Sequence, residues 1–149
     1  MADKIIDYIS GVELAATPEE IESTQVFSKM LVEDYNYPKD LIQTRPQFHV
    51  KLRPSDTKKK YPVGIAVFSS SKKDDDDVYI IVECKKKNRK DGLSQLENYL
   101  TFSKASLGVW FNGEEKVALQ KIEGDGKVQF EEISDIPSYG QRVEDVGKY

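Results

Sequence analysis

Three consecutive residues, Glu83, Cys84 and Lys85, stand at the end of an apolar run and carry the side chains best suited to chemistry in this chain. Successive side chains of a β-strand point to opposite faces, so Glu83 and Lys85 are expected to share one face and Cys84 to point away. A carboxylate binds hard cations such as Mg²⁺, and a neighbouring lysine can hold an attacking water or stabilise developing negative charge. The spacing therefore suits metal-assisted chemistry on a phosphate.

The residue expected opposite Glu83 is Gly64. Two apolar runs, 61–68 and 78–82, are joined by a polar loop, which predicts an antiparallel hairpin. Pairing the end of the first run with the start of the second sets Gly64 opposite Val82 or Glu83, at a cross-strand distance of about 5 Å. A carboxylate at position 64 would give a divalent cation a second protein ligand, and glycine offers none.

An amphipathic helix is expected near the N-terminus. After a short helix-like opening, the sequence "TPEE" predicts a helix start, with Thr17 as N-cap, Pro18 at the first helical position and Glu20 closing a capping box. Apolar residues then keep helical spacing until the helix stops near Pro38.

A second helix is expected over 91–104, with Ser94 and Glu97 able to form a capping box. Gln95 and Tyr99 are four residues apart in it and therefore lie on one helix face. They can orient a site or contact nucleic acid from that face, or they can be a polar helix edge without a function.

Alternating residues predict further strands. In 46–54 the apolar side chains alternate with His49, Lys51 and Arg53, which places these three on the opposite face. We therefore expect His49 to be a surface residue or a phosphate contact rather than a catalytic base. Strands are also expected within 107–111, 116–122 and 127–132, and the first two are joined by an Asn-Gly turn.

Other metal-binding patterns are absent from the sequence. The chain has one cysteine and one histidine, so it has no zinc-ligand cluster and forms no internal disulfide. The aspartates at 74–77 lack the spaced ligands and the glycine of a calcium-binding loop, and we interpret them as a solvated turn.

Length and composition indicate one globular domain. The chain has 149 residues, of which 38% are hydrophobic and 32% are charged. No apolar run approaches the roughly 20 residues that span a bilayer, and the start has no signal-like apolar core. We therefore expect a cytoplasmic protein without membrane partners, with a single domain over 1–149 and its core at about 17–131.

Basic side chains are concentrated in the middle of the chain. Residues 1–44 carry 3 basic and 9 acidic side chains, residues 45–113 carry 14 and 8, and residues 114–149 carry 5 and 9. Phosphate responds to the local field, so the net charge of −4 does not exclude nucleic acid. The basic stretches flank the two apolar runs of the hairpin, although lysine-rich stretches are also common in solvated loops.

An ordered set of motifs resembles the N-terminal nuclease domain of type I restriction enzyme R subunits, a branch of the PD-(D/E)xK nucleases. The motifs are "TPEE", "YPKDLIQTRPQF", "YPVGIAVF", "YIIVECKKKN", "SQLENYLTFS" and "GVWFNG". The resemblance covers most of 17–122 and implies an α/β restriction-endonuclease-like fold, in which helices flank a central mixed sheet. It also implies Mg²⁺- or Mn²⁺-dependent hydrolysis of double-stranded DNA, within a larger restriction-modification protein of which this chain is an N-terminal fragment.

The resemblance assigns roles to individual residues. Glu83 matches the metal-binding acid, Lys85 the catalytic lysine, and Cys84 a position that offers its backbone carbonyl to the metal. Gln95 and Tyr99 match the Gln-x-x-x-Tyr signature of this branch. Glu20 stands where related nucleases often carry an acid on the first helix, and its capping-box role explains it equally well.

The chain departs from the family pattern at Gly64, where the resemblance calls for aspartate. Mg²⁺ is commonly held by one or two protein carboxylates, so loss of one weakens metal binding. We therefore expect cleavage to be impaired, whether Gly64 is natural or a disarming substitution.

The basic residues are the expected DNA contacts, namely Lys51, Arg53, Lys86, Lys87 and Arg89. An alternative to the nuclease is a catalytically dead module that binds DNA through these residues. Another alternative is a module whose acidic flanks dock onto other restriction-modification subunits or onto a fused translocase or methyltransferase region.

Overall fold

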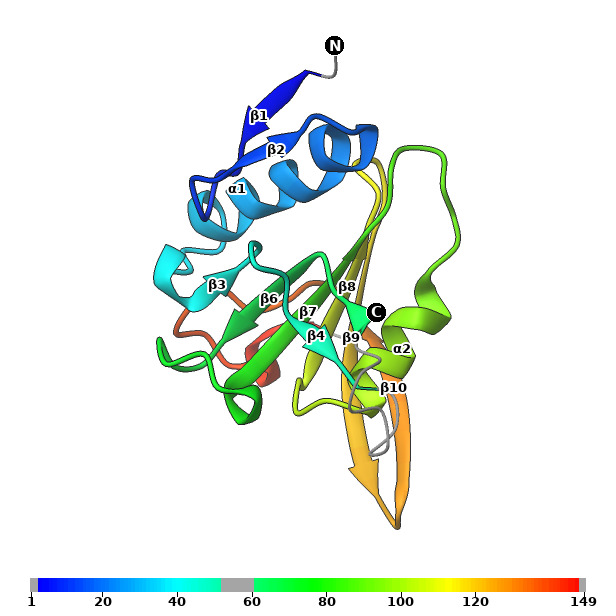
Figure 1. Cartoon of the computed structure of the whole chain (residues 1–149). Helices are drawn as coiled ribbons and strands as arrows, with labels where there is room; N and C mark the ends of the chain where they lie inside the picture. The colour runs from blue at the N-terminus through cyan, green and yellow to red at the C-terminus, as the bar shows by residue number, and fades with distance from the viewer. Residues whose placement is uncertain (1–2, 52–60, 148–149) are drawn as a thin grey trace.

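A six-stranded mixed sheet forms the centre of the computed structural model, which describes residues 3–51 and 61–147 (Figure 1). Strands β7 and β8 are parallel, and the other neighbouring strands are antiparallel. In sheet order the strands are β10 (Lys127–Ile133), β9 (Lys116–Gly124), β8 (Leu107–Phe111), β7 (Val78–Cys84), β6 (Ile65–Phe68) and β3 (Ile42–Gln43). The expected α/β fold with a central mixed sheet flanked by helices is confirmed.

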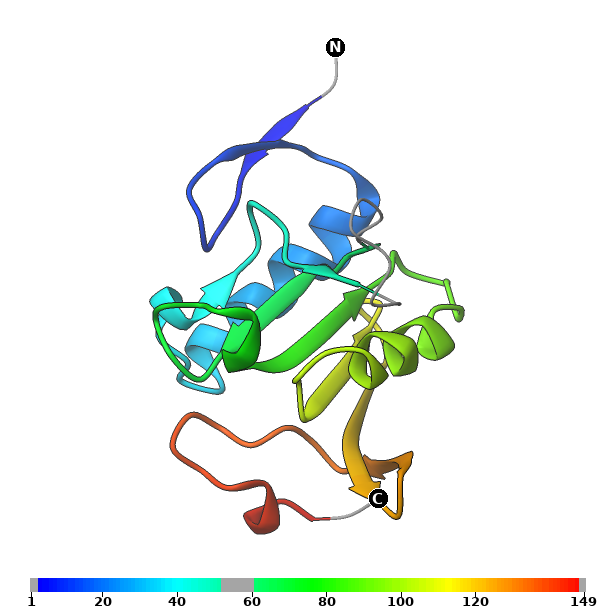
Figure 2. The ribbon, with the colours of Figure 1, turned by 60° about the horizontal axis from the view of Figure 1, so that its bottom comes forward.

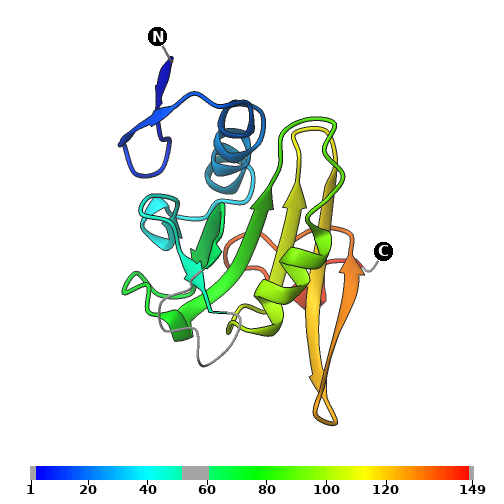
Figure 3. The same ribbon diagram turned by 45° about the vertical axis from the view of Figure 1, so that its right-hand side comes forward.

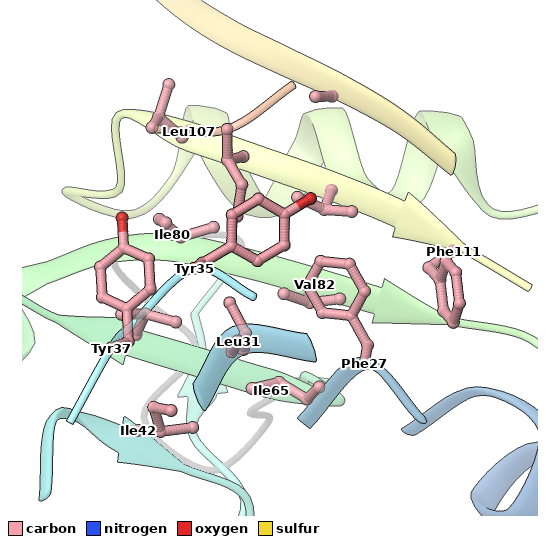
Figure 4. Close-up of a cluster of buried hydrophobic side chains, with 14 of the residues drawn as sticks. Phe27, Leu31, Tyr35, Tyr37, Ile42, Ile65, Ile80, Val82, Leu107 and Phe111 are labelled. Atoms are coloured by element: carbon pink, nitrogen blue, oxygen red, sulfur yellow. The ribbon is translucent and has the colours of Figure 1, made fainter. Parts of the chain in front are cut away.

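The first face of the sheet is covered by the N-terminal helix. The chain is helical over 18–33, with a π-helical turn, η1 (Glu20–Thr24), followed by α1 (Gln25–Glu33). Phe27 and Leu31 of α1 are fully buried and pack over Ile65 and Val82 of the sheet (Figure 4). This confirms the predicted amphipathic helix.

The second face is covered by α2 (Leu93–Thr101), which follows β7 in the chain. Leu96, Tyr99 and Leu100 are buried in a cluster separate from that of α1, so the two helices lie on opposite faces of the sheet. The helix packs closely on β8, because a β-carbon on Gly108 would lie 2.7 Å from Cδ1 of Leu100. The N-cap is Gly92 and no side-chain cap forms, so the predicted capping box was wrong.

Strands β4 (His49–Val50) and β5 (Tyr61–Pro62) form a two-stranded antiparallel sheet on the face of the central sheet that α2 covers. Phe48 and Val50 are buried in the α2-side cluster, whereas His49 is exposed, as the alternation predicts. The predicted continuous strand over 61–68 is instead divided into β5 and β6, with Val63 and Gly64 between them.

The N-terminal residues form a hairpin of β1 (Lys4–Ile6) and β2 (Glu13–Ala15), so the helix-like opening was wrong. The turn is closed by Asp7, whose carboxylate accepts hydrogen bonds from the backbone N–H and the hydroxyl of Ser10. Gly11 follows with φ of +79°, a conformation that favours glycine. These turn hydrogen bonds and the glycine conformation favour a hairpin over the helix that the sequence pattern predicted.

Short 3₁₀ turns, η2 (Lys39–Leu41) and η3 (Asp75–Asp77), connect α1 to β3 and β6 to β7. The four aspartates at 74–77 are largely exposed, in keeping with the expected solvated turn. The β9–β10 hairpin projects beyond the other strands (Figure 3). Within the described ranges, no helix has the length and apolar character needed to cross a membrane.

The last described segment, residues 134–147, packs against the segment that follows α1 (Figure 2). It contains a 3₁₀ turn, η4 (Val143–Asp145), and otherwise lacks regular structure. The hydroxyl of Tyr35 donates to the carboxylate of Asp135 at 2.7 Å, and the hydroxyl of Tyr37 donates to the carbonyl of Pro137 at 2.7 Å. Ile136 is buried in the α1-side cluster, so this segment is part of the fold.

Candidate active site

Glu83 and Lys85 lie side by side where β7 ends. A β-carbon placed on Gly92 would lie 2.7 Å from Cε of Lys85 and 3.6 Å from Cγ of Glu83, so both side chains border the same backbone position. The backbone of Lys85 continues the pairing with β8, because its N–H donates to the carbonyl of Phe111 at 2.9 Å. The prediction that Glu83 and Lys85 share one face is confirmed.

Cys84 points to the opposite face and belongs to the α1-side core. Burial raises the pKa of its thiol to about 12, although hydrogen bonds with the hydroxyls of Thr24 and Ser23 oppose this increase. A thiol with such a pKa contains almost no thiolate at neutral pH and is a poor nucleophile. The role expected for the Cys84 carbonyl as a metal ligand stays a prediction.

The carboxyl group of Glu83 is buried and incompletely satisfied. The residue is 8% exposed, and its Oε2 has no hydrogen-bond partner among the residues that the structure describes. Burial raises its pKa to about 7, the charge of Lys85 opposes this increase, and the charges of Glu19 and Asp91 add to it. A buried carboxylate oxygen without a partner requires an explanation, and a bound cation would supply the missing interaction. Glu83 therefore fits the expected role of metal ligand.

Lys85 lies between two acidic side chains, those of Asp91 and Glu83. Its Nζ lies 4.0 Å from Oδ2 of Asp91, and its side chain is 18% exposed. Arg89 also binds Asp91 through two hydrogen bonds of 2.7 and 2.6 Å. The lysine thus acts on Glu83 through its charge and also forms an ion pair with the loop that leads to α2.

The side chains of Gln95 and Tyr99 meet on α2, where Tyr99 is buried against the sheet and Gln95 is exposed. The side-chain amide of Gln95 donates a hydrogen bond of 2.6 Å to the hydroxyl oxygen of Tyr99. Burial raises the pKa of Tyr99 to about 12, and the charge of Glu83 contributes to this increase. The charge of Glu83 therefore acts on Tyr99, while the catalytic role of Tyr99 and Gln95 stays a prediction.

Gly64 directly precedes β6, in which Ile65 pairs with Val82. Gly64 lies in a bend one residue outside this paired register, so its expected position opposite Val82 or Glu83 stays a prediction. A β-carbon on Gly64 would lie 3.2 Å from Sγ of Cys84 and 3.2 Å from the Val82 carbonyl oxygen. An aspartate at this position therefore requires the Cys84 side chain to move slightly, and the shared metal site of residues 64 and 83 stays a prediction.

Glu20 interacts with Arg45, with 3.2 Å between its Oε1 and Nη2 of the arginine. Its backbone N–H donates to Oγ1 of Thr17 at 3.2 Å, so one half of the predicted capping box forms. The other half does not form, because the Thr17 N–H donates to the carbonyl of Ala15. The first-helix acid whose charge acts on Glu83 is instead Glu19. The sequence analysis did not predict this role for Glu19, because the capping-box pattern indicated Glu20.

The expected DNA contacts are placed in two regions. Lys86, Lys87 and Arg89 are exposed in the loop after β7, although Arg89 is engaged by Asp91. Lys51 lines a separate groove of about 890 Å³ between β4 and the C-terminal end of α2. The expected contact Arg53 lies outside the described residues. In the part of the chain that the structure describes, no group of three or more His, Cys, Asp or Glu residues is arranged to hold a metal ion.

A comparison with known families decides where this fold and site belong. The model of the Type I restriction enzyme R protein N terminus matches residues 18–137, most of the chain. The chain belongs to this family. No curated protein and no solved structure gives a significant match. Type I restriction R proteins are components of restriction-modification systems, which associates the chain in general terms with DNA and with the other subunits of such systems.

Proposed function

We propose that the chain is a metal-dependent DNA endonuclease domain of a restriction-modification system, impaired because glycine occupies position 64. The observation that carries this proposal is the buried Oε2 of Glu83, which has no hydrogen-bond partner within residues 3–51 and 61–147. The side chains of Glu83 and Lys85 border the same backbone position, that of Gly92. Membership in the R protein family supports the assignment to restriction. The proposed partners are double-stranded DNA and either other subunits or a fused translocase or methyltransferase region.

The proposed roles are those that the family resemblance gives to the residues at the end of β7. Glu83 and the carbonyl of Cys84 would hold Mg²⁺ or Mn²⁺, which would supply an activated water and neutralise phosphate charge. Lys85 holds the attacking water or stabilises the charge that develops on the phosphate. The Gln95–Tyr99 pair orients Glu83 from the adjacent helix. Lys86 and Lys87 contact the DNA backbone.

Gly64 explains the proposed impairment. With Glu83 as the carboxylate ligand from β7, a divalent cation lacks the second carboxylate that the family pattern supplies. An aspartate at position 64 restores that ligand, and the crowding by Cys84 determines how well the aspartate fits. Metal affinity and cleavage are therefore expected to increase in Gly64→Asp, and to increase further when Cys84→Ala removes the nearby sulfur.

The test is a supercoiled-plasmid nicking assay with Mg²⁺ or Mn²⁺. It compares the unaltered chain with Gly64→Asp, Gly64→Asp/Cys84→Ala, Gly64→Asp/Lys85→Ala and the matched control Gly64→Asn, which adds a similar volume without a carboxylate. We expect nicking by Gly64→Asp and Gly64→Asp/Cys84→Ala. We expect none by Gly64→Asp/Lys85→Ala or by the Gly64→Asn control. Equal nicking by Gly64→Asp and Gly64→Asn would contradict the metal-ligand role of the added carboxylate.

A second function is favoured by the exposed Lys86 and Lys87 next to a site that lacks the second carboxylate of the family pattern. In that case the chain is a DNA-binding module without nuclease activity. Failure of every variant to cut, together with salt-sensitive duplex binding, would establish this alternative. If salt-sensitive binding is also absent, docking onto other restriction-modification subunits through the acidic flanks becomes the leading function.

A further inference from the structure

The turn that begins α2 lies directly against Lys85. Gly92 is the N-cap residue and has φ of +105°, a conformation that L side chains rarely adopt. A β-carbon at this position would lie 2.7 Å from Cε of Lys85, closer than such atoms approach in proteins. The absence of a side chain at residue 92 therefore leaves the space that the aliphatic part of Lys85 occupies.

The backbone of this turn is anchored to β8 and to the residue that follows it. The indole Nε1 of Trp110 donates a hydrogen bond of 2.7 Å to the carbonyl of Asp91, and Trp110 itself is 4% exposed. The side-chain amide of Asn112 donates to the carbonyl of Arg89 at 2.9 Å. The buried side chain of Trp110 thus holds the backbone of residues 91 and 92 near the end of β8.

Asp91 supplies the electrostatic part of the same arrangement. Its Oδ2 lies 4.0 Å from Nζ of Lys85, and Arg89 holds the same carboxylate in place. Within the described ranges, Lys85 forms no ion pair of 4.0 Å or less with Glu83, and Oε2 of Glu83 stays without a partner. By attracting the ammonium group, Asp91 leaves the carboxylate of Glu83 open to a cation.

We propose that the Asp91–Gly92 turn positions Lys85 for reaction. Gly92 admits the aliphatic chain of the lysine, Asp91 directs its ammonium group away from Glu83, and Trp110 anchors both through the backbone. Asp91 and Gly92 are positioning residues, because they act through Lys85. The catalytic consequence rests on the proposed function, whereas the position of Lys85 can be measured without any cleavage.

The first test measures the ¹³Cε chemical shift and relaxation of Lys85 by NMR in the otherwise unaltered chain. Gly92→Ala is compared with Gly126→Ala, because Gly126 also has a positive φ, +73°, but no atom lies within 4 Å of its β-carbon position. The two variants therefore share the backbone strain, and only Gly92→Ala displaces Lys85. We expect a shifted and more mobile Lys85 Cε in Gly92→Ala and an unchanged one in Gly126→Ala. The proposal is overturned if Gly92→Ala leaves the Lys85 signal unchanged.

The second test uses Asp91, whose exposed side chain can be altered without disturbing the core. In the Gly64→Asp background, Asp91→Asn is expected to lower kcat by about 10- to 100-fold, because a displacement of about 1 Å has an effect of this size. KM for DNA is expected to stay within about twofold, and Asp91→Glu is expected to recover most of kcat. An unchanged kcat in Asp91→Asn would overturn the role of Asp91.

The two tests separate this inference from the proposed function. If Gly64→Asp does not cleave DNA, the proposed function fails and the NMR comparison still decides the position of Lys85. For that case Asp91→Asn is also measured by NMR, and it is expected to increase the mobility of Lys85 Cε. If the Lys85 signal is the same in Gly92→Ala, in Asp91→Asn and in the unaltered chain, the positioning role is refuted whatever the plasmid assay shows.

Discussion

Gly64 and Cys84 face each other so closely that a β-carbon on residue 64 would lie 3.2 Å from Sγ of the cysteine. This distance is shorter than most contacts of real β-carbons, so the sulfur must move when any side chain is introduced. The packing of the two residues is therefore coupled, although the thiol of Cys84 belongs to the core and Gly64 to the candidate site.

Gly64→Ala is expected to lower the free energy of unfolding by about 1 kcal/mol, as overpacking of a tight contact typically does. In a Cys84→Ala background the same substitution is expected to cost less, because the sulfur is gone and only the Val82 carbonyl oxygen stays at 3.2 Å. Urea unfolding of the four chains measures this coupling. Gly124→Ala serves as the control, since nothing lies within 4 Å of its β-carbon position. Equal effects of Gly64→Ala in both backgrounds would refute the predicted contact.

The raised pKa of Glu83, about 7, predicts how stability depends on pH. The folded state holds a proton on Glu83 that the unfolded state releases near its ordinary pKa of 4.5, so stability falls as pH rises from 4.5 through 7. Glu83→Gln removes this dependence. At pH 8 the free energy of unfolding of the variant is expected to exceed that of the unaltered chain by on the order of 2 kcal/mol. Urea unfolding between pH 4 and 8 measures the difference. A difference that does not change with pH would contradict the raised pKa.

The Gln95–Tyr99 hydrogen bond predicts energetic coupling between the two side chains. Tyr99→Phe and Gln95→Ala are each expected to lower the free energy of unfolding by about 1 kcal/mol, because each leaves the other group without its partner. The free energy of unfolding of the double variant is expected to fall by less than the sum of the two single decreases. Thermal or urea unfolding of the four chains gives the coupling energy. Strict additivity would show that the 2.6 Å contact carries no net energy.

Lys86 and Lys87 predict the salt dependence of DNA binding. Replacing both with alanine is expected to weaken duplex binding and to reduce the slope of log K against log salt by about 2, roughly one for each phosphate that is no longer neutralised. Fluorescence anisotropy with a labelled duplex, measured over a series of salt concentrations, gives this slope. Lys127→Ala, at the far end of the β9–β10 hairpin, is the matched control and is expected to leave the slope unchanged. Identical slopes for the double variant and the control would exclude this loop as a phosphate-binding segment.

Much of the fold follows from periodicity. The alternation of apolar residues predicts the buried side chains of β4, and two apolar runs joined by a polar loop predict the hairpin of β6 and β7. Helical spacing predicts α1 and α2. Burial on one face imposes these patterns, so they are visible without the structure. The break between β5 and β6 is not visible, because residues 61–68 are apolar throughout, apart from Gly64, and carry no alternation.

The candidate site could be predicted only where it lies within one element or one hairpin. The shared face of Glu83 and Lys85 follows from strand alternation, and the Gln95–Tyr99 contact follows from helical spacing. Asp91, Gly92 and Trp110 could not be found in this way, because a loop and a distant strand bring them to Lys85. The pairing of Glu20 with Arg45 also depends on tertiary structure, and the capping pattern gave no indication of it.

The two tyrosines that follow α1 also define where the domain can be divided. Tyr35 and Tyr37 are nearly buried and direct their hydroxyl groups to Asp135 and Pro137. A chain shortened after Ile133 would expose the surrounding core and remove both acceptors, although every strand of the central sheet would still be present. Grafting or domain exchange among R proteins should therefore keep residues 134–147 with the sheet, since a boundary drawn at the last strand would separate groups that stabilise each other.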